Sequence, residues 1–126
     1  MTDKSIAPTG LKRRSEFLFV RGGLSQRRKT IVIQAREQRD SDGIRVGFTA
    51  TKKVGNAVIR NRAKRRMRAA ASELLTQFGV SGCDYVFISR AQTPHVEWQS
   101  LLDDIESALI TLRQRLAADP GLPPKD

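Results

Sequence analysis

The sequence has few of the side chains on which disulfides, metal sites and nucleophilic catalysis depend: its 126 residues include one cysteine and one histidine. The single cysteine, Cys83, excludes an internal disulfide and is compatible with a reducing cytoplasmic setting. A reactive thiol and an inert buried side chain both fit Cys83, and burial is favoured. The single histidine, His95, excludes a metal site that needs two histidines.

Long apolar runs are also missing. No apolar segment approaches the roughly 18–20 residues that span a bilayer. Residues 1–10 lack the apolar stretch of a secretory signal. We therefore expect a cytoplasmic protein that has no membrane partner.

Acidic residues are scarce in the first half of the chain. Residues 1–68 carry 19 Lys and Arg against 5 Asp and Glu, whereas residues 69–126 carry 4 against 8, and the whole chain has a formal net charge of +10. Self-repulsion of that size opposes compaction and indicates a polyanionic partner. Nucleic acid is the first candidate and an anionic membrane surface a distant second, whereas a merely solvated surface would mix both signs along the chain.

The length suits one compact domain. We expect that domain at residues 11–118, between a flexible tail at 1–10 and a disordered tail at 119–126, where proline and glycine follow the last periodic segment. The expected order of elements is α-β-β-α-β-α. This order predicts an α/β (α+β) two-layer sandwich of helices on one small sheet.

The first half of the domain predicts one short helix and two strands. Ser15 is expected to cap a helix that runs to Arg21 and stops at a left-handed Gly22-Gly23. Strands are expected at about 30–36 and 44–51. Both strands have one apolar face, which favours an antiparallel sheet covered on one side only.

The second half predicts a long helix, an interior strand and a last helix. The long helix is expected at about 56–78, with a buried stripe formed by Ile59, Ala63, Met67, Ala70 and Leu74. The continuous apolar run within residues 84–90 suits an interior strand. Thr93-Pro94 is expected to begin the last helix, which runs to about Leu116.

The segment 52–68, KKVGNAVIRNRAKRRMR, holds eight Lys and Arg and no acid. A solvated helix face would normally place Asp or Glu three or four residues from each base, and positive charge at a helix N-terminus opposes the helix dipole. Both penalties disappear if phosphates bind there. Arg outnumbers Lys five to one within the helix, which favours forked phosphate contacts.

The polar face of the two strands and the first helix offer a second candidate surface. Val32, Gln34, Arg36, Thr49 and Thr51 would line a polar trough suited to a single strand of nucleic acid, and an ordinary wet sheet face explains the same pattern. Phe17 and Phe19 are either base-stacking platforms or core residues, and periodicity favours the core. No arrangement of histidine, cysteine or carboxylates predicts a catalytic residue, a metal site or a small-molecule substrate.

These residues resemble a known family. The segment 45–68, RVGFTATKKVGNAVIRNRAKRRMR, resembles the signature of the bacterial ribonuclease P protein component, whose core is Arg60-Asn61-Arg62. The segments LKRRSEF at 11–17 and DYVFISR at 84–90 resemble its N-terminal helix and third main strand. The resemblance covers about residues 11–116.

The resemblance implies a fold of the ribosomal-protein-S5 second-domain type with a left-handed β-α-β crossover through the basic helix. It also implies an accessory subunit of an endoribonuclease, which binds a catalytic RNA and the 5′ leader of precursor tRNA. The protein alone would bind no cofactor, because the RNA subunit would hold the Mg²⁺ ions that the holoenzyme needs for hydrolysis.

By position, the resemblance implies two sets of site residues. The RNA-facing set is Lys52, Lys53, Asn56, Arg60, Asn61, Arg62, Lys64, Arg65, Arg66 and Arg68. The leader-binding set is Arg13, Arg14, Phe17, Val32, Gln34, Thr49, Thr51 and Lys53. The family often has a second aromatic where this chain has Arg21, and another at the position of Gln34. Leader contacts are therefore expected to depend more on hydrogen bonds and charge than on stacking.

Two other classes of protein share part of the pattern. A ribosomal or general structured-RNA-binding protein would share the charge and the sheet, but would not require the string at 45–68. A helix-turn-helix DNA-binding protein would need a helix shortly before the basic one, where a strand is expected instead.

Overall fold

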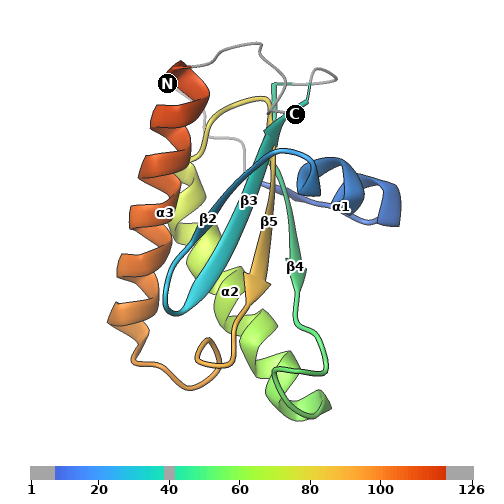
Figure 1. Ribbon diagram of the computed structural model, residues 1–126, viewed down its shortest axis with the longest axis vertical. Helices are drawn as coiled ribbons and strands as arrows, with labels where there is room; N and C mark the ends of the chain where they lie inside the picture. Colours follow the sequence, from blue (N-terminus) through green and yellow to red (C-terminus); the bar gives the residue numbers. More distant parts are fainter. Residues whose placement is uncertain (1–7, 39–41, 119–126) are drawn as a thin grey trace.

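A computed structural model of the protein describes residues 8–38 and 42–118, and these residues form one five-stranded sheet with three helices (Figure 1). The elements in chain order are β1 (Thr9–Gly10), α1 (Arg14–Arg21), β2 (Leu24–Arg27), β3 (Ile31–Glu37), β4 (Arg45–Thr49), α2 (Ala57–Phe78), β5 (Cys83–Ser89) and α3 (Trp98–Ala118). No helix in the described ranges has the length and apolar character needed to cross a membrane. The expected mixed α/β fold is confirmed, with β1 and β2 as additional short strands.

Strand β5 occupies the centre of the sheet, whose order is β1-β4-β5-β3-β2. It pairs with β3 in the antiparallel sense and with β4 in the parallel sense. The strands expected at about 30–36 and 44–51 correspond to β3 and β4. They do not pair with each other in one antiparallel sheet as expected, because β5 lies between them. An apolar run such as Tyr85–Ile88 buries side chains on both faces, which requires a central position.

The parallel pairing makes β4, α2 and β5 a crossover unit through the basic helix. Its handedness and the S5-type label stay predictions of the resemblance.

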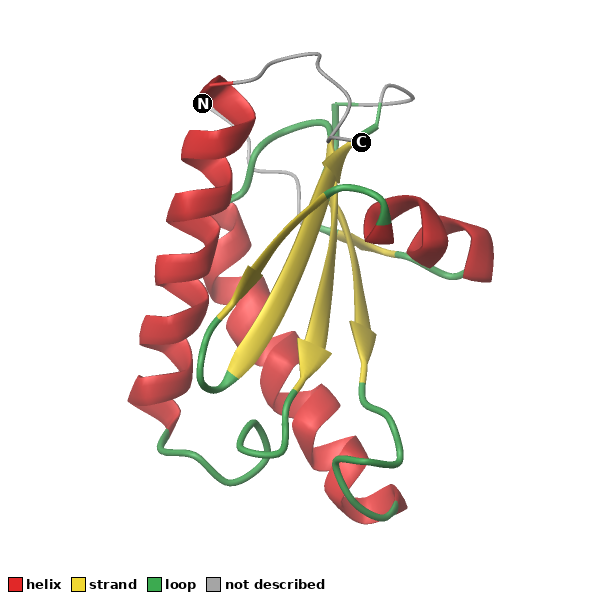
Figure 2. Ribbon diagram, viewed as in Figure 1, coloured by secondary structure: helices red, strands yellow, loops and turns green. Residues whose placement is uncertain are grey.

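Helices α2 and α3 cover one face of the sheet and form the main core (Figure 2). Ile31, Ile33 and Phe87 point from the strands into this core and are fully buried. On α2, the expected stripe is confirmed: Ile59 is half-buried and the other four members are buried. Asp104 fixes α3 to the sheet by accepting hydrogen bonds from the Thr30 backbone N–H (3.1 Å) and the Thr30 hydroxyl (2.9 Å).

Helix α1 lies on the opposite face of the sheet, so that face is partly covered. Its inner side chains join a smaller cluster that contains Leu11, Val20 and Val86. Sequence periodicity predicted a sheet covered on one side only, and α1 corrects this expectation. Because α1 is only eight residues long, it leaves the end of the sheet beyond it open.

Two local expectations, about one chain end and one helix cap, are wrong. Thr9 and Gly10, expected in the flexible tail, pair with Arg45 and Val46 of β4. Ser15 does not cap α1; Glu16 does, because its Oε1 accepts the backbone N–H groups of Lys12 (2.7 Å) and Arg13 (2.9 Å). The flexible and disordered tails expected at residues 1–7 and 119–126 lie outside the described residues.

The expected left-handed turn at Gly22-Gly23 is wrong, and Gly23 is needed for space instead. Gly22 has a right-handed backbone conformation (φ −79°, ψ −1°). A Cβ on Gly23 would lie 2.4 Å from the Ala35 carbonyl oxygen and 2.6 Å from the Arg36 Cβ. The chain therefore passes so close to β3 after α1 that a side chain at Gly23 would not fit.

Helix α3 begins at Trp98, four residues after the expected start at Pro94. Thr93 was expected beside the helix start, but its side chain binds the sheet instead. Its hydroxyl accepts the backbone N–H of Arg90 (2.8 Å) and donates to the Thr30 carbonyl oxygen. These bonds fix Thr93 to the ends of β5 and β3. The chain needs the following residues to reach the start of α3.

Candidate nucleic-acid interface

The first half of α2 extends past the ends of the strands (Figure 1). Asn56 starts the helix as expected, because its Oδ1 accepts the Ile59 backbone N–H at 2.9 Å. Gly55 precedes it with φ +151°, which a side chain would strain. The sheet does not cover these turns, so their cationic side chains remain accessible.

Most of the expected RNA-facing residues are exposed at this end of the molecule. The exposed members are Lys52, Lys53, Asn56, Asn61, Arg62, Arg65 and Arg68. Arg60 and Lys64 are half-buried. The Arg60 Nε is buried and, among the described residues, has no hydrogen-bond partner. The arrangement concentrates positive charge where the helix dipole is also positive, a combination that attracts anions.

Arg66 differs from its neighbours because its guanidinium binds the protein itself. Its Nη1 donates to the Thr93 carbonyl oxygen at 2.7 Å, and its Nη2 donates to the Val96 carbonyl oxygen. The group also lies over the Trp98 ring, 5.6 Å from its centroid. Desolvation, and then the charge of Arg62, lower the pKa of Arg66 from its ordinary value. The structure thus places Arg66 in the link between α2 and the loop before α3, apart from the exposed cations.

A second surface lies on the sheet face that carries α1, hereafter the α1 face. Strand register aligns Thr49, Ile88 and Val32 across three strands, and Arg27 of β2 extends this row. Thr49, Ile88 and Val32 are half-buried and Arg27 is exposed. The next row, toward α1, contains Gln34, Val86 and Gly47. The α1 face therefore combines apolar contact area with hydroxyl, amide and guanidinium groups.

Phe17 stands where α1 meets this surface. A Cβ added to Gly47 would lie 2.5 Å from two atoms of the Phe17 ring, so the ring lies directly on the backbone of β4. Phe17 also packs with the cluster of Leu11, Val20 and Val86, yet it stays half-buried. Of the two interpretations of Phe17, core packing is therefore observed for one side of the ring, and its remaining surface is accessible.

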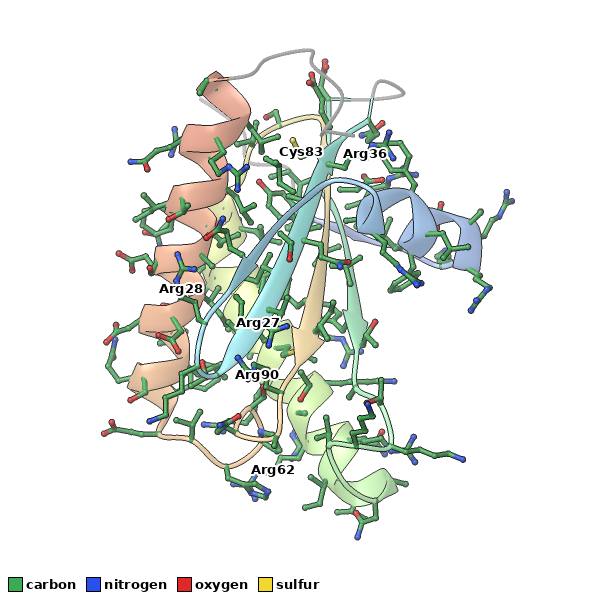
Figure 3. All side chains as sticks on the ribbon, in the orientation of Figure 1. Arg27, Arg28, Arg36, Arg62, Cys83 and Arg90 are labelled. Carbon is green, nitrogen blue, oxygen red and sulfur yellow. The ribbon has the colours of Figure 1, made fainter. Side chains whose placement is uncertain are left out.

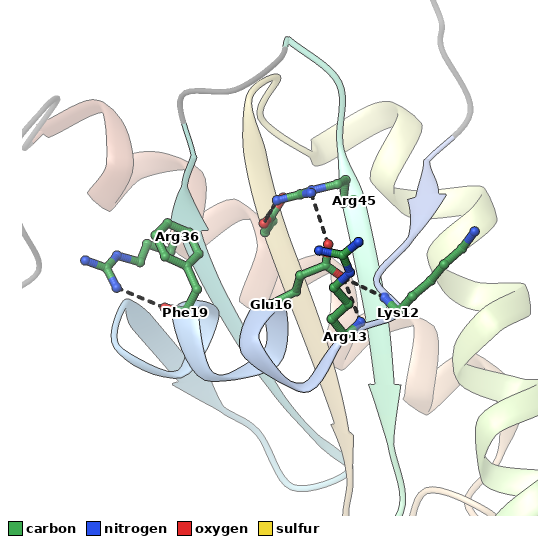
Figure 4. A network of polar contacts seen from close by, with 7 residues as sticks. Lys12, Arg13, Glu16, Phe19, Arg36 and Arg45 are labelled. Carbon is green, nitrogen blue, oxygen red and sulfur yellow. Dashed lines mark hydrogen bonds and ion pairs between the residues drawn. The ribbon is translucent and has the colours of Figure 1, made fainter.

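A polar network fixes α1 on the sheet (Figure 4). Arg45 forms a forked ion pair with the fully buried Asp84, with N···O distances of 2.8 and 2.6 Å. Its third nitrogen is 3.4 Å from Glu16. At the other end of the helix, Arg36 donates to the Phe19 carbonyl oxygen at 3.0 Å and lies 4.3 Å from the centroid of the Phe19 ring. Arg36, expected on the open trough, is thus a tether for α1.

The carboxylates beside the α1 face are engaged by backbone and guanidinium donors. Hydrogen bonds from the backbone N–H groups of Arg13 and Lys12 lower the pKa of Glu16, so it remains an ionised helix cap at neutral pH. Both carboxylate oxygens of Asp84 accept hydrogen bonds from Arg45. No group of three or more His, Cys, Asp or Glu in the described ranges is arranged to hold a metal ion.

The remaining expected residues of the leader set lie around the α1 face. Arg13 and Arg14 are exposed at the start of α1, and Thr51 and Lys53 are exposed in the loop that joins β4 to α2. Arg27 and Ile88 were not among the expected leader-binding residues, yet both lie on this face. In Figure 3, Arg27 and Arg62 both lie in the lower half of the view. Arg27 joins the row through the β2–β3 hairpin, whose first strand was not expected, and Ile88 joins it through the pairing of β5 with β3, which is distant in sequence.

Comparison with known proteins gives a consistent result. The family model "Ribonuclease P" matches residues 7–113. The ribonuclease P protein component of Caulobacter vibrioides is 48% identical over 103 residues, covering 81% of this chain and 69% of the relative. A Staphylococcus aureus RNase P protein mutant has a TM-score of 0.72 at 23% identity, covering 82% of this chain and 87% of that one. For the RNase P protein of Thermotoga maritima the TM-score is 0.70 at 24% identity, with coverages of 80% and 94%.

Proposed function

Because this chain belongs to the ribonuclease P protein family and is the protein subunit of that endoribonuclease, we propose how it divides the work with its RNA. The exposed cations of α2 bind the catalytic RNA, and the α1 face holds the 5′ leader of precursor tRNA. Hydrolysis takes place on the RNA subunit with Mg²⁺ that the RNA holds. The assembly works in the cytoplasm and leaves a 5′-phosphate on the tRNA.

The observation that carries this proposal is the position of the two surfaces relative to each other. The loop at residues 50–56 leads directly from the end of β4 on the α1 face to the first turn of α2. Thr51 and Lys53 lie in that loop and are exposed. An RNA bound to α2 is therefore placed next to a substrate strand that lies on the α1 face.

The chemistry of each surface suits a different ligand. Arg62 and Arg65 present forked donors that match phosphate oxygens, and structured RNA offers many phosphates close together. The α1 face is shallow, with Val32 and Ile88 for base contact and Thr49 and Gln34 for hydrogen bonds. These are the features of a surface that binds an extended single strand without strict sequence preference. A mature tRNA has no leader and gains nothing from this surface.

The engaged carboxylates support placing hydrolysis on the RNA. Metal-assisted phosphodiester cleavage needs carboxylates free to bind Mg²⁺ or to activate water. Beside the α1 face, Glu16 and Asp84 are committed to the α1 cap and to Arg45. The contribution of this chain is therefore binding and orientation of the two RNAs.

The test is reconstitution with purified components. We expect no cleavage of precursor tRNA by rigorously RNA-free protein, and recovery of 5′ maturation when the protein is added to catalytic RNA at low Mg²⁺. Cleavage by the protein alone, lost on substitution of a single Asp or Glu, would contradict the proposal.

A further inference from the structure

A pocket of about 340 Å³ lies between the β1–β4 edge and α2. Its lining includes Gly10, Val46, Phe48, Arg68, Ala71 and Ser72. Val46 and Phe48 pack with the main core on the α2 side of the sheet, whereas Gly47 and Thr49 alternate with them and point to the α1 face. The pocket is thus on the opposite side of the sheet from the proposed leader site.

Gly10 is the residue through which the pocket can be narrowed from the sheet side. Gly10 pairs with Val46, so a side chain at position 10 would point to the same side of the sheet as Val46, toward α2. A Cβ built on Gly10 meets no heavy atom within 4 Å. A larger residue would fit the strand without a clash at its Cβ and would occupy part of the space.

The walls of the pocket combine an aromatic ring with a cation. Phe48 is half-buried and is supported from behind by the fully buried Phe87, with ring centroids 5.6 Å apart. The exposed Arg68 guanidinium lies over Phe48, 5.4 Å from the ring centroid. The Ser72 hydroxyl adds a hydrogen-bonding group at the rim. An aromatic ring, an exposed guanidinium and a hydroxyl suit a stacked nucleobase with a neighbouring phosphate.

The pocket is continuous with the basic surface of α2. Arg68 is the last member of the cationic run and follows Lys64 by one helical turn. An RNA that contacts Arg65 and Lys64 through its phosphates therefore passes the mouth of the pocket.

We propose that this pocket receives the base of an unpaired nucleotide of the RNA subunit, stacked on Phe48, while Arg68 contacts the base or its phosphate. The inference rests on the proposed function of α2 and adds a subsite to it. The base anchors the RNA at the β1–β4 edge, where the phosphate contacts of α2 end.

The first experiment uses the full-length protein and adenosine monophosphate as the probe. We expect nuclear magnetic resonance titration to shift the backbone signals of Gly10, Phe48 and Ser72, with a weaker effect from inorganic phosphate. Equal shifts from phosphate would mean simple anion binding at Arg68 and would overturn the proposal. Contacts from another segment of the chain into the pocket of the free protein would also overturn it.

The second experiment uses the protein bound to the catalytic RNA. Gly10→Leu fills the pocket from the sheet side, and Ser72→Leu narrows it from the helix side. Thr76→Leu, exposed one turn further along α2, is the matched control. Base-specific chemical probing should show one or a few unpaired bases protected by the native protein and by Thr76→Leu, and exposed with either pocket variant. Because a stacked base contributes on the order of 1–3 kcal/mol, affinity for the RNA should fall at least about fivefold.

The readouts separate this inference from the proposed function. If the pocket is correct, Gly10→Leu weakens binding of the catalytic RNA but leaves the ratio of precursor to mature tRNA affinity unchanged. An identical probing pattern for native protein and both pocket variants would overturn the pocket while leaving the proposed function intact. If the native holoenzyme bound precursor and mature tRNA with equal affinity, that result would instead contradict the proposed function.

Discussion

At the scale of single residues, the Phe17 ring lies between α1 and β4, against the backbone of Gly47. One side of the ring packs with Leu11, Val20 and Val86, and the other remains accessible beside the α1 face. The same side chain therefore positions α1 and leaves part of an aromatic surface accessible beside the proposed leader site.

Phe17→Ala should accordingly affect two measurable quantities. Truncating a fully buried Phe costs roughly 3–5 kcal/mol of folding free energy, so the half-buried Phe17 should cost about 2 kcal/mol in denaturant unfolding. Affinity for precursor tRNA in the holoenzyme should also fall, by about 1–3 kcal/mol if a base stacks on the ring. Leu18→Ala is the control, because Leu18 is 45% exposed on the same helix. Loss of stability with unchanged precursor affinity would show that the ring serves only the fold.

The sequence could not decide between the two roles of Phe17 because helical periodicity reports only which side of a helix faces inward. Whether the ring meets another side chain or a bare backbone depends on Gly47, which is 30 residues away. Arg36 was correctly predicted on the polar face of β3, but its partner could not be predicted. Its contact with Phe19 depends on where α1 crosses the sheet.

At the scale of secondary-structure elements, α2 has two groups of arginines with different tasks. Arg62 and Arg65 are exposed, whereas Arg66 binds the carbonyl oxygens of Thr93 and Val96. The sequence motif alone assigns these arginines the same RNA-binding role, because all of them belong to one basic segment. Only the fold shows that the loop before α3 comes within reach of Arg66.

The two groups should separate in a salt titration of binding to the catalytic RNA. Changing Arg62 and Arg65 together to Ala should flatten the slope of log affinity against log salt by about 1.5 units, because each lost phosphate contact removes roughly 0.7–0.9. Arg66→Ala should leave the slope unchanged and should lower the free energy of unfolding by about 1.5–3 kcal/mol. A flattened slope with unchanged stability for Arg66→Ala would assign that side chain to the RNA.

Strand β5 carries two buried groups that titrate at high pH. Desolvation, and then the charges of Glu37 and Asp84, raise the pKa of Cys83 to about 12. Desolvation is also the main cause that raises the pKa of Tyr85. Both groups are neutral when protonated, so the folded state retains protons that the unfolded chain releases.

Stability should therefore fall as pH rises above about 9, where the unfolded Cys83 thiol begins to ionise. Each group fully ionised only in the unfolded state contributes a slope of about 1.4 kcal/mol per pH unit. Cys83→Ala should reduce that slope between pH 9 and 12 in urea unfolding experiments, and thiol reagents should modify native Cys83 slowly at pH 8. Rapid modification of the folded protein at pH 8 would contradict the buried, raised-pKa state.

Elements with strong local signals were predictable, and pairings between distant segments were not. The bounds of α2 follow from its apolar stripe, the Asn56 cap and Gly79. The apolar run of β5 predicted an interior strand, but it did not indicate which two strands would flank it. Strand β2 is a short, polar edge strand without a clear apolar face, so no strand was expected there.

At the scale of the whole molecule, the charge asymmetry of the sequence becomes a spatial division. The basic first half of the chain contributes the α1 face and the first turns of α2, which are the two proposed RNA surfaces. The acidic second half contributes α3, on the opposite side of the molecule from α1 (Figure 1). Exposed carboxylates such as Asp103 and Glu106 on α3 are thus kept away from the phosphates.

The charge pattern alone could not predict that this protein binds the 5′ leader of precursor tRNA, and the family resemblance was needed for that prediction. Charge and periodicity indicated a polyanion, but several RNA-binding proteins would share them. The specific string at 45–68 distinguished among them, and the structure then placed its two ends on adjoining surfaces.

The central claim is that the α1 face distinguishes precursor from mature tRNA, and the most direct test compares their affinities for the holoenzyme. Thr49→Val with Lys53→Ala removes two polar groups from this surface and its adjoining loop, and should leave the melting temperature nearly unchanged. We expect precursor affinity to fall roughly tenfold, since each lost hydrogen bond contributes about 0.5–1.5 kcal/mol, while mature tRNA affinity stays the same. Equal losses for the two RNAs would contradict the claim.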